Sequence, residues 1–307
     1  MDLAAGTPAR DVAADVAERL AAAGVPSPAA DARWLLEGIT GVDPHRTPER
    51  ALPDDRIAAL IDAVARRVAR EPLQLIVGST SFRGIELVCR PGVFVPRPET
   101  EVVAGIAVTA ATARRQAVAG ETPARVTVVD VCTGTGAIAC CLAVEVDACQ
   151  VVATDLDPDA VRLARANLGR TRDGRAGVAG FAQDSGAEVV HGNLLNGVDP
   201  SLRGKLDVLV ANPPYLPERD QDGWEPEVAD HDPVTALVGG VDGHELVDQL
   251  LHLATEWLAP GGTVVVEIDE RRGARAADVA REAGLIDVEV VDDLTGAARC
   301  VVGRRPG

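Results

Sequence analysis

The chain has 307 residues, 47% hydrophobic and 25% charged, which allows one large domain or two ordinary ones and includes no apolar run long enough to cross a membrane. Its net charge is −17 and uneven, because the first 98 residues hold 13 acidic side chains and 12 arginines while the rest hold 34 acidic and 18 basic ones. A region this acidic would be repelled by a phosphate backbone, so we expect no direct DNA binding.

The amino terminus and the cysteines indicate the compartment. The first residues lack the basic and then apolar pattern of a secretory signal. The six cysteines show no paired metal-ligand spacing, which predicts reduced thiols and no metal site. We therefore expect a cytoplasmic protein that has no membrane association.

Residues 1–73 are predicted to form a small helical bundle. Apolar side chains recur at helical spacing, as at Val12, Val16 and Leu20, and prolines divide the segment into short helices. The bundle could serve stability alone or could hold a macromolecular partner. Residues 74–98 contain short apolar runs separated by glycines, which indicates a β-hairpin linker.

Residues 99–307 alternate strand and helix patterns, which is typical of a doubly wound α/β sheet. The predicted strands are 126–130, 150–154, 187–191, 206–211, 262–268, 286–292 and 298–302. The predicted helices are 101–117, 136–146, 158–168, 243–258 and 272–283.

The first of these strands leads into a glycine-containing turn that suggests a nucleotide-like ligand. Asp130 ends the strand, and Gly134 and Gly136 let the backbone approach a ligand closely. Asp155 ends the next strand, about 20 residues later, where an acid binds ribose hydroxyls in dinucleotide folds. Ala139 leaves the dinucleotide pattern undecided. S-adenosylmethionine, which has ribose and an ammonium but no phosphate, suits the acidic residues better, with turn capping as the structural alternative.

A second turn, Asn212-Pro213-Pro214-Tyr215, follows the apolar strand 206–211. The two prolines forbid both helix and further sheet pairing, so a rigid turn is expected at the strand's carboxyl end, where open α/β sheets bind ligands. The Asn212 oxygen and the Pro213 carbonyl could accept the two hydrogens of a planar –NH2 group, and Tyr215 could stack on it. The structural alternative is an ordinary Asn-Pro turn.

The segment after this turn is strongly acidic. Residues 218–232 contain seven acids and one arginine. They could form a solvated loop, or an acidic surface near the site that attracts a basic protein segment.

With these motifs, the chain resembles the HemK/PrmC family of protein-glutamine methyltransferases, which act on peptide chain release factors. The resemblance runs nearly from end to end, and its most specific part is Pro96-Arg97-Pro98-Glu99-Thr100-Glu101. The other matching motifs are Glu71 to Gln74 with Gly78, Phe82 to Gly84, Asp130 to Gly136, Asp155, Asn212 to Tyr215, Glu227-Val228, Ala236-Leu237, Gly239-Gly240, Asp242-Gly243, Glu267-Ile268, Asp293-Leu294, Gly296 and Arg299.

The resemblance implies a helical substrate-recognition domain, a hairpin linker, and a Rossmann-like methyltransferase domain with a seven-stranded sheet over residues 99–307. It implies S-adenosylmethionine as cofactor and, as substrate, the glutamine side chain in the Gly-Gly-Gln loop of a release factor. Asn212, Pro213 and Tyr215 would be catalytic, and Asn212, Pro213, Pro214 and Tyr215 would bind the glutamine. The cofactor would contact Asp130, Cys132, Thr133, Gly134, Thr135, Gly136, Asp155, Asn193, Leu194 and Asn212.

This sequence departs from the family pattern at several positions. Glycine is usual in place of Cys132, an acid in place of Asn193, glycine in place of Asp269, glutamine in place of Arg272 and tyrosine in place of Leu75. Two other enzymatic functions remain open, methylation of an amino group on a nucleic-acid base or on a small metabolite. A module that binds S-adenosylmethionine without catalysis is a further alternative.

Overall fold

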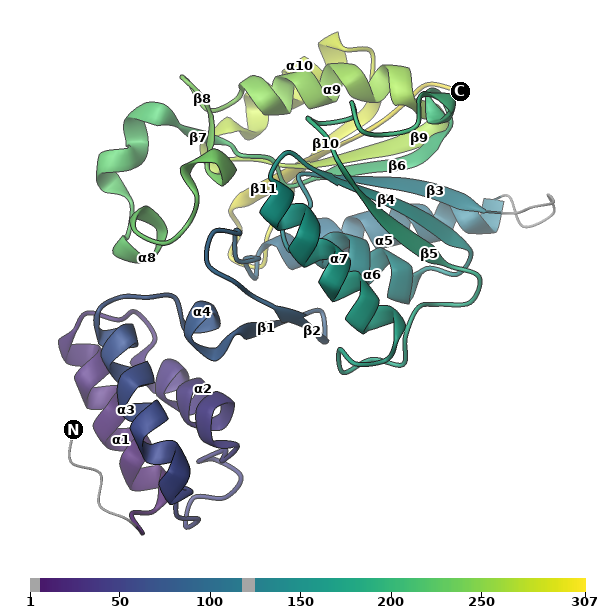
Figure 1. Cartoon of the computed structure of the whole chain (residues 1–307). Coiled ribbons are helices and arrows are strands. Elements are labelled where there is room, and N and C mark those ends of the chain that lie inside the picture. Colours follow the sequence, from purple (N-terminus) through teal and green to yellow (C-terminus); the bar gives the residue numbers. More distant parts are fainter. Residues whose placement is uncertain (1–5, 118–124) are drawn as a thin grey trace. The chain divides into compact units, whose positions relative to one another are not determined.

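The computed structural model describes residues 6–117 and 125–307 and divides the chain into two compact units (Figure 1). The helical unit comprises Met1–Thr80, Cys89–Pro91 and Trp224–His231. The α/β unit comprises Ser81–Val88, Gly92–Gly223 and Asp232–Gly307. The domain boundaries at residues 73 and 98 stay a prediction.

Four helices from the start of the chain form most of the helical unit. They are α1 (Ala9–Ala22), α2 (Pro28–Thr40), α3 (Asp54–Val68) and α4 (Leu73–Val77). The side chains predicted to share a helix face, such as Val12, Val16 and Leu20, are buried with Leu35 and Leu60 in one core. The short helix α8 (Pro226–Ala229) also belongs to this unit.

Arg67 in α3 and Arg70 in the turn after α3 form ion pairs with Glu227 in α8. The Arg67 guanidinium is 5% exposed and donates hydrogen bonds to Asp31 Oδ2 at 2.7 Å and to Glu227 Oε1 at 2.9 Å. Arg70 donates to both Glu227 oxygens, each at 2.6 Å, and to Glu225. Burial disfavours the charged Glu227, but the hydrogen bonds from Arg70 and Arg67 outweigh it and lower its pKa to about 2.

The α/β unit contains a seven-stranded sheet in the order β10-β11-β9-β6-β3-β4-β5 (Figure 1). Its strands are β3 (Val126–Val131), β4 (Cys149–Asp155), β5 (Gly186–His191), β6 (Leu206–Ala211), β9 (Leu258–Glu267), β10 (Ile286–Asp292) and β11 (Ala298–Arg304). All seven correspond to the predicted strands. The pairs among β5, β4, β3, β6 and β9 are parallel, whereas β11 lies antiparallel between β9 and β10.

Helices cover both faces of the sheet and bury two separate cores. Successive side chains of a strand point to opposite faces of the sheet, so Val128 packs in one core and its neighbour Val129 packs in the other. The helices α5 (Thr100–Ala117), α6 (Ala137–Glu145) and α7 (Pro158–Arg172) contribute to the first core. The helices α9 (Glu245–Trp257) and α10 (Gly273–Glu282) contribute to the second. The predicted Rossmann-like, doubly wound α/β architecture is confirmed.

Strand β9 begins earlier than the sequence predicts. The pattern suggests a start at residue 262, but the strand already pairs at Leu258 with Leu206 and has a register shift before Thr263. Backbone hydrogen bonds with Arg305 hold Gly261 and Gly262 at the sheet, with Gly261 at a φ of 74°. The Pro-Gly-Gly stretch is thus an irregular part of the strand that its neighbours hold in place.

The two units also contain shorter elements. They are β1 (Ser79–Phe82), β2 (Ile85–Val88), β7 (Leu216–Pro217), β8 (Val238–Gly240), and the 3-10 turns η1 (Pro200–Leu202), η2 (Glu218–Gly223), η3 (Val234–Ala236) and η4 (Glu270–Arg272). All six cysteines are free, and five of them are buried. Within residues 6–117 and 125–307, no helix has the length and apolar character needed to span a membrane.

Candidate active site

The two turns predicted from the sequence follow neighbouring strands. β3 pairs with β4 on one side and with β6 on the other, and the chain changes direction across the sheet between β3 and β6. The carboxyl ends of strands at such a switch point form the ligand crevice of open α/β sheets. The Asp130–Gly136 loop and the Asn212–Tyr215 turn therefore share this edge.

The loop after β3 is held in a tight conformation that places its backbone at the edge of the sheet. Cys132, Gly134 and Gly136 have φ values of 58°, 55° and 83°. A side chain at Gly136 would be strained, because φ is positive there and a Cβ would lie 3.2 Å from the Cα and Cβ atoms of Ala164 in α7. Cys132 occupies the left-handed region despite its side chain, which packs against the second core.

Asp130 is buried at the base of this loop with one oxygen unsatisfied. Its Oδ2 accepts hydrogen bonds from the Thr133 hydroxyl at 2.5 Å and from the Ala139 N–H at 3.1 Å, whereas Oδ1 has no partner among the described residues. Burial raises the pKa of Asp130 to about 7. A cation close to Oδ1 would satisfy this oxygen and favour the ionised carboxylate.

Asp155 connects the β3 loop with the end of β4. Its Oδ2 accepts the Gly134 N–H at 2.8 Å, and its Oδ1 accepts the Asp157 N–H at 2.9 Å. Burial raises its pKa. Each oxygen retains a further lone pair, so the carboxylate can still accept a hydroxyl hydrogen.

The turn after β5 lies beside Asp155. The Gly192 N–H donates to the Asp155 carbonyl at 2.9 Å. Asn193 is exposed, whereas Leu194 adopts a φ of 51° and buries its side chain in the second core. The two predicted cofactor residues of this turn thus have different surroundings.

The Asn212–Tyr215 turn is held by residues that the sequence analysis did not place in the site. The Asn212 Nδ2 donates to the Thr100 hydroxyl at 3.3 Å, and the Tyr215 hydroxyl donates to Glu267 Oε1 at 3.2 Å. Pro213 is buried and Pro214 half-buried. Burial, together with the charge of Glu267, raises the pKa of Tyr215, so its phenol remains a neutral donor.

Two glycines allow the chain to pack closely around this turn. A Cβ at Gly239 would lie 2.4 Å from the Pro214 carbonyl oxygen, and one at Gly243 would lie 2.7 Å from the Tyr215 carbonyl oxygen. Both glycines belong to motifs that match the family, but the sequence alone does not indicate which residues they contact. Thr100 belongs to the motif from Pro96 to Glu101, but nothing in the sequence connects it with Asn212. Glu267 shows a usable signal, because it ends an apolar strand as Asp130 does.

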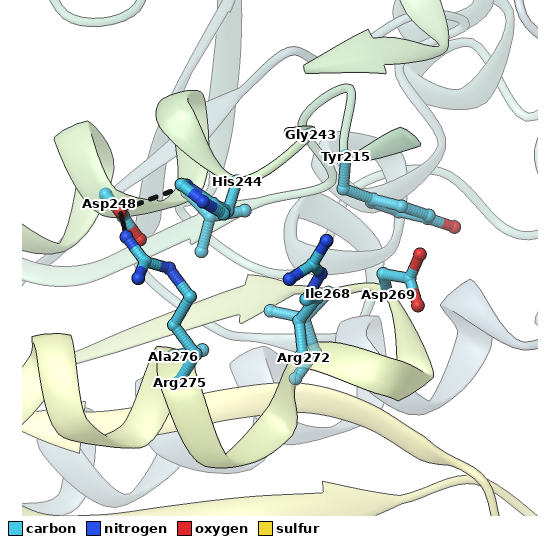
Figure 2. Close-up of a pocket in the computed structure, with 10 residues that line it drawn as sticks. Tyr215, Gly243, His244, Asp248, Ile268, Asp269, Arg272, Arg275 and Ala276 are labelled. Carbon is cyan, nitrogen blue, oxygen red and sulfur yellow. Dashed lines mark hydrogen bonds and ion pairs between the residues drawn. The ribbon is translucent and has the colours of Figure 1, made fainter. Parts of the chain in front are cut away.

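Tyr215 also lines a small pocket between α9 and α10 (Figure 2). Asp248 accepts a hydrogen bond from Arg275 at 2.6 Å and lies 3.3 Å from His244 Nδ1 on one side of this pocket. Asp269 and Arg272, two positions that depart from the family pattern, lie on the side of Tyr215 (Figure 2). These departures therefore change the surroundings of the site tyrosine.

The acidic segment is partly neutralised. Four of its seven acids form ion pairs with arginines: Asp220 with Arg271, Glu225 with Arg70, Glu227 with Arg67 and Arg70, and Asp232 with Arg97. Attraction of a basic protein segment would depend mainly on the other three, Glu218, Asp222 and Asp230.

Comparisons with known proteins match both units. A model of the PrmC N-terminal domain matches residues 11–78, and a model of the methyltransferase small domain matches residues 116–225. A release factor glutamine methyltransferase of Mycolicibacterium smegmatis is 38% identical over 93% of this chain and 94% of its own length. Proteins of the same name from Streptomyces coelicolor (39%, covering 95% and 96%) and Deinococcus radiodurans (40%, covering 97% and 99%) are similarly close.

The order of the sheet and the matching small domain place the chain among the Rossmann-like methyltransferases. Relatives that match over nearly their full length at 38% to 40% identity identify the family within this class. The chain belongs to the family of release factor glutamine methyltransferases, as the resemblance predicted.

Proposed function

We propose that this protein transfers the methyl group of S-adenosylmethionine to the side-chain amide nitrogen of a glutamine in the Gly-Gly-Gln loop of a peptide chain release factor. The observation that carries the proposal is the orientation of Asn212. Its Nδ2 is engaged by Thr100, which leaves Oδ1 free to accept a hydrogen from a substrate amide. Relatives that carry the name release factor glutamine methyltransferase support the choice of substrate.

The residues of the β3 and β4 loops fit S-adenosylmethionine. The buried Asp130 Oδ1, which has no partner among the described residues, suits the ammonium of the cofactor's amino acid. Asp155 suits its ribose hydroxyls. The loop from Cys132 to Gly136 would let the cofactor approach the backbone closely at Gly134 and Gly136, with Asn193 and Leu194 near the base. The absence of phosphate in this cofactor agrees with the acidic charge of these loops.

The chemistry requires alignment more than proton abstraction. The amide nitrogen is a weak nucleophile, because its lone pair is delocalised into the carbonyl. Asn212 Oδ1 and the Pro213 carbonyl would accept its two hydrogens, and Tyr215 would fix its plane. When bound, S-adenosylmethionine supplies a methyl group on a positively charged sulfur. Transfer would form a C–N bond, return the C–S electron pair to sulfur and release one N–H proton. The two acceptor oxygens would stabilise the positive charge that develops on nitrogen.

The helical unit is assigned the role of holding the release factor. We propose residues 1–73 as the recognition domain, 74–98 as the linker and 99–307 as the methyltransferase domain. The match of residues 11–78 to the PrmC N-terminal domain supports this division.

Mass spectrometry of an unmethylated release factor tests the function. After incubation with the protein and S-adenosylmethionine, we expect one added methyl group on the glutamine of the Gly-Gly-Gln loop. A release factor in which that glutamine is replaced by alanine serves as the control. Methylation of an oligonucleotide or a small amine, with the release factor unmodified, would contradict the proposal and favour the alternative functions.

Cofactor affinity should increase with pH because of Asp130. Its pKa of about 7 means that the carboxyl is protonated below that pH and ionised above it. A positively charged ammonium binds the ionised form, and an amino group of this type keeps its charge up to about pH 7.5. Between pH 5.5 and 7.0 we therefore expect the Kd for S-adenosylmethionine to fall about tenfold, with proton release in calorimetry. Asp130→Asn should bind weakly and lose this dependence; an unchanged dependence would exclude Asp130 as its source.

A further inference from the structure

Glu267 is a buried carboxyl that the proposed chemistry does not use. It ends β9, follows the run Val264, Val265 and Val266, and is 0% exposed. Ala211 pairs with Val266 in the parallel register, so the next residues along the two strands are Asn212 and Glu267. A carboxyl at such a position is costly unless it forms hydrogen bonds, which points to a specific role.

The carboxyl is connected to both functional side chains of the turn. Its Oε1 accepts the hydrogen bond of Tyr215 at 3.2 Å. The Thr100 hydroxyl also interacts with the Glu267 carboxyl and lowers the pKa of this carboxyl. The same hydroxyl accepts a hydrogen bond from Asn212 Nδ2 at 3.3 Å, so its own hydrogen is available to the carboxylate. Oε2 is buried and accepts no hydrogen bond from the described residues.

This chain of hydrogen bonds has a direction. An ionised carboxylate can only accept, so the Tyr215 hydroxyl must donate to it, and its charge attracts the hydrogen of the Thr100 hydroxyl. Thr100 then offers a lone pair to Asn212, whose Nδ2 must face Thr100 and whose Oδ1 must face away from it. An asparagine with the opposite orientation would present a donor to the substrate amide and repel its hydrogens.

We propose that Glu267 is a positioning residue that orients Asn212 through Thr100 and fixes Tyr215 directly, so that the turn presents an acceptor and a flat ring to the glutamine. The proposal rests on the proposed function and extends it. It adds two residues, Glu267 and Thr100, that do not touch the substrate.

The protonation state of Glu267 controls this arrangement. Burial raises its pKa to about 7, while Thr100, Arg299 and Tyr215 counteract the increase and Glu99 adds to it. Arg299 is itself held by Asp293 at 2.8 Å, and the buried Cys300 pairs with Glu267 in the sheet. Below about pH 7 the carboxyl gains a proton, for which Oε2 is available, and loses the negative charge that orders the two hydroxyl groups. We therefore expect kcat to increase with pH through about 7.

The first test compares Glu267→Gln with the wild type in methylation of the release factor. Glutamine keeps the shape of the side chain but carries no negative charge, so it no longer orders the Tyr215 and Thr100 hydroxyl groups as a carboxylate does. We expect kcat to fall about 10- to 100-fold and its pH dependence to flatten, with the Kd for S-adenosylmethionine changed less than about threefold. Thr100→Val should lower kcat to a similar extent, whereas Thr100→Ser, which keeps the hydroxyl, should retain most of the activity. A Glu267→Gln enzyme with wild-type kcat and pH profile would overturn the proposal.

A second test does not depend on the reaction. Tyr215 is the only tyrosine of the chain, so 13C-labelled tyrosine gives a single Cζ signal in NMR. In the wild type we expect this signal to shift with an inflection near pH 7, and in Glu267→Gln we expect none. Because His244 lines the pocket beside Tyr215, His244→Gln is the control and should retain the inflection. Loss of the inflection in His244→Gln, or its persistence in Glu267→Gln, would refute the role of Glu267 whether or not the release factor is the substrate. A wild type that shows the inflection but methylates no release factor would instead contradict the proposed function alone.

Discussion

Replacing Asn212 with alanine is expected to lower kcat for methylation of the release factor by about 10²- to 10³-fold, the effect of removing one preorganised group that stabilises developing charge. The alanine has no oxygen to accept the amide hydrogen, so the nitrogen is neither aligned nor stabilised as it gains positive charge. Cofactor binding depends mainly on the loops after β3 and β4, so the Kd for S-adenosylmethionine should change less than about threefold.

Single-turnover kinetics with saturating cofactor would measure this effect, and calorimetry would measure the Kd. Asn196→Ala is a suitable control, because Asn196 is an exposed asparagine in the turn after β5. We expect the control to keep wild-type rates. Near-normal turnover in Asn212→Ala would remove Asn212 from the chemistry.

Replacing Arg67 with alanine is expected to destabilise the helical unit by about 3 kcal/mol. The substitution leaves the carboxylate of Asp31 without its partner while its side chain is only 13% exposed. Removing one member of a buried ion pair typically costs 3 to 5 kcal/mol, roughly, because the other charge remains buried. Glu227 keeps its contacts with Arg70, so we place the cost at the lower end.

Hydrogen exchange of the full chain would localise this loss. Amides of α2 and α3 that exchange through opening of this unit should do so about 100-fold faster in Arg67→Ala. Arg56→Ala is the matched control on the same helix, since the Arg56 side chain is 57% exposed and lies 3.6 Å from Asp55. A surface pair of this kind contributes about 0.5 kcal/mol or less. Equal protection in the two variants would show that the Arg67 network has no such effect.

The sequence predicts the local elements well and the contacts between them poorly. Valine-rich runs such as 126–131 and 206–211 identify the strands, because parallel strands buried on both faces are continuously apolar. Pro213 and Pro214 identify the turn, and Asp130 and Asp155 end adjacent strands as expected. These features depend on residues close together in the chain.

Contacts between distant segments were not predictable from one sequence. Tyr215 and Glu267 are 52 positions apart, and Asn212 and Thr100 are 112 apart. The first contact depends on the placement of β9 beside β6, and the second depends on the packing of α5 against β6. Likewise, the acidic segment suggested a free surface because its arginine partners, Arg67 and Arg70, lie far away in the sequence.

The path of the chain after the Asn-Pro-Pro-Tyr turn affects how truncated proteins should be interpreted. Residues 224–231 leave the α/β unit and belong to the helical unit, where Arg67 and Arg70 bind Glu227. A shortened protein that begins at residue 74 would lack the partners of this segment and leave a loose, negatively charged loop that begins nine residues after Tyr215. Inactivity of such a fragment would then have two causes, lost recognition of the release factor and a disturbed catalytic loop. A shortened protein that also carries Glu225→Gln and Glu227→Gln would distinguish between these two causes.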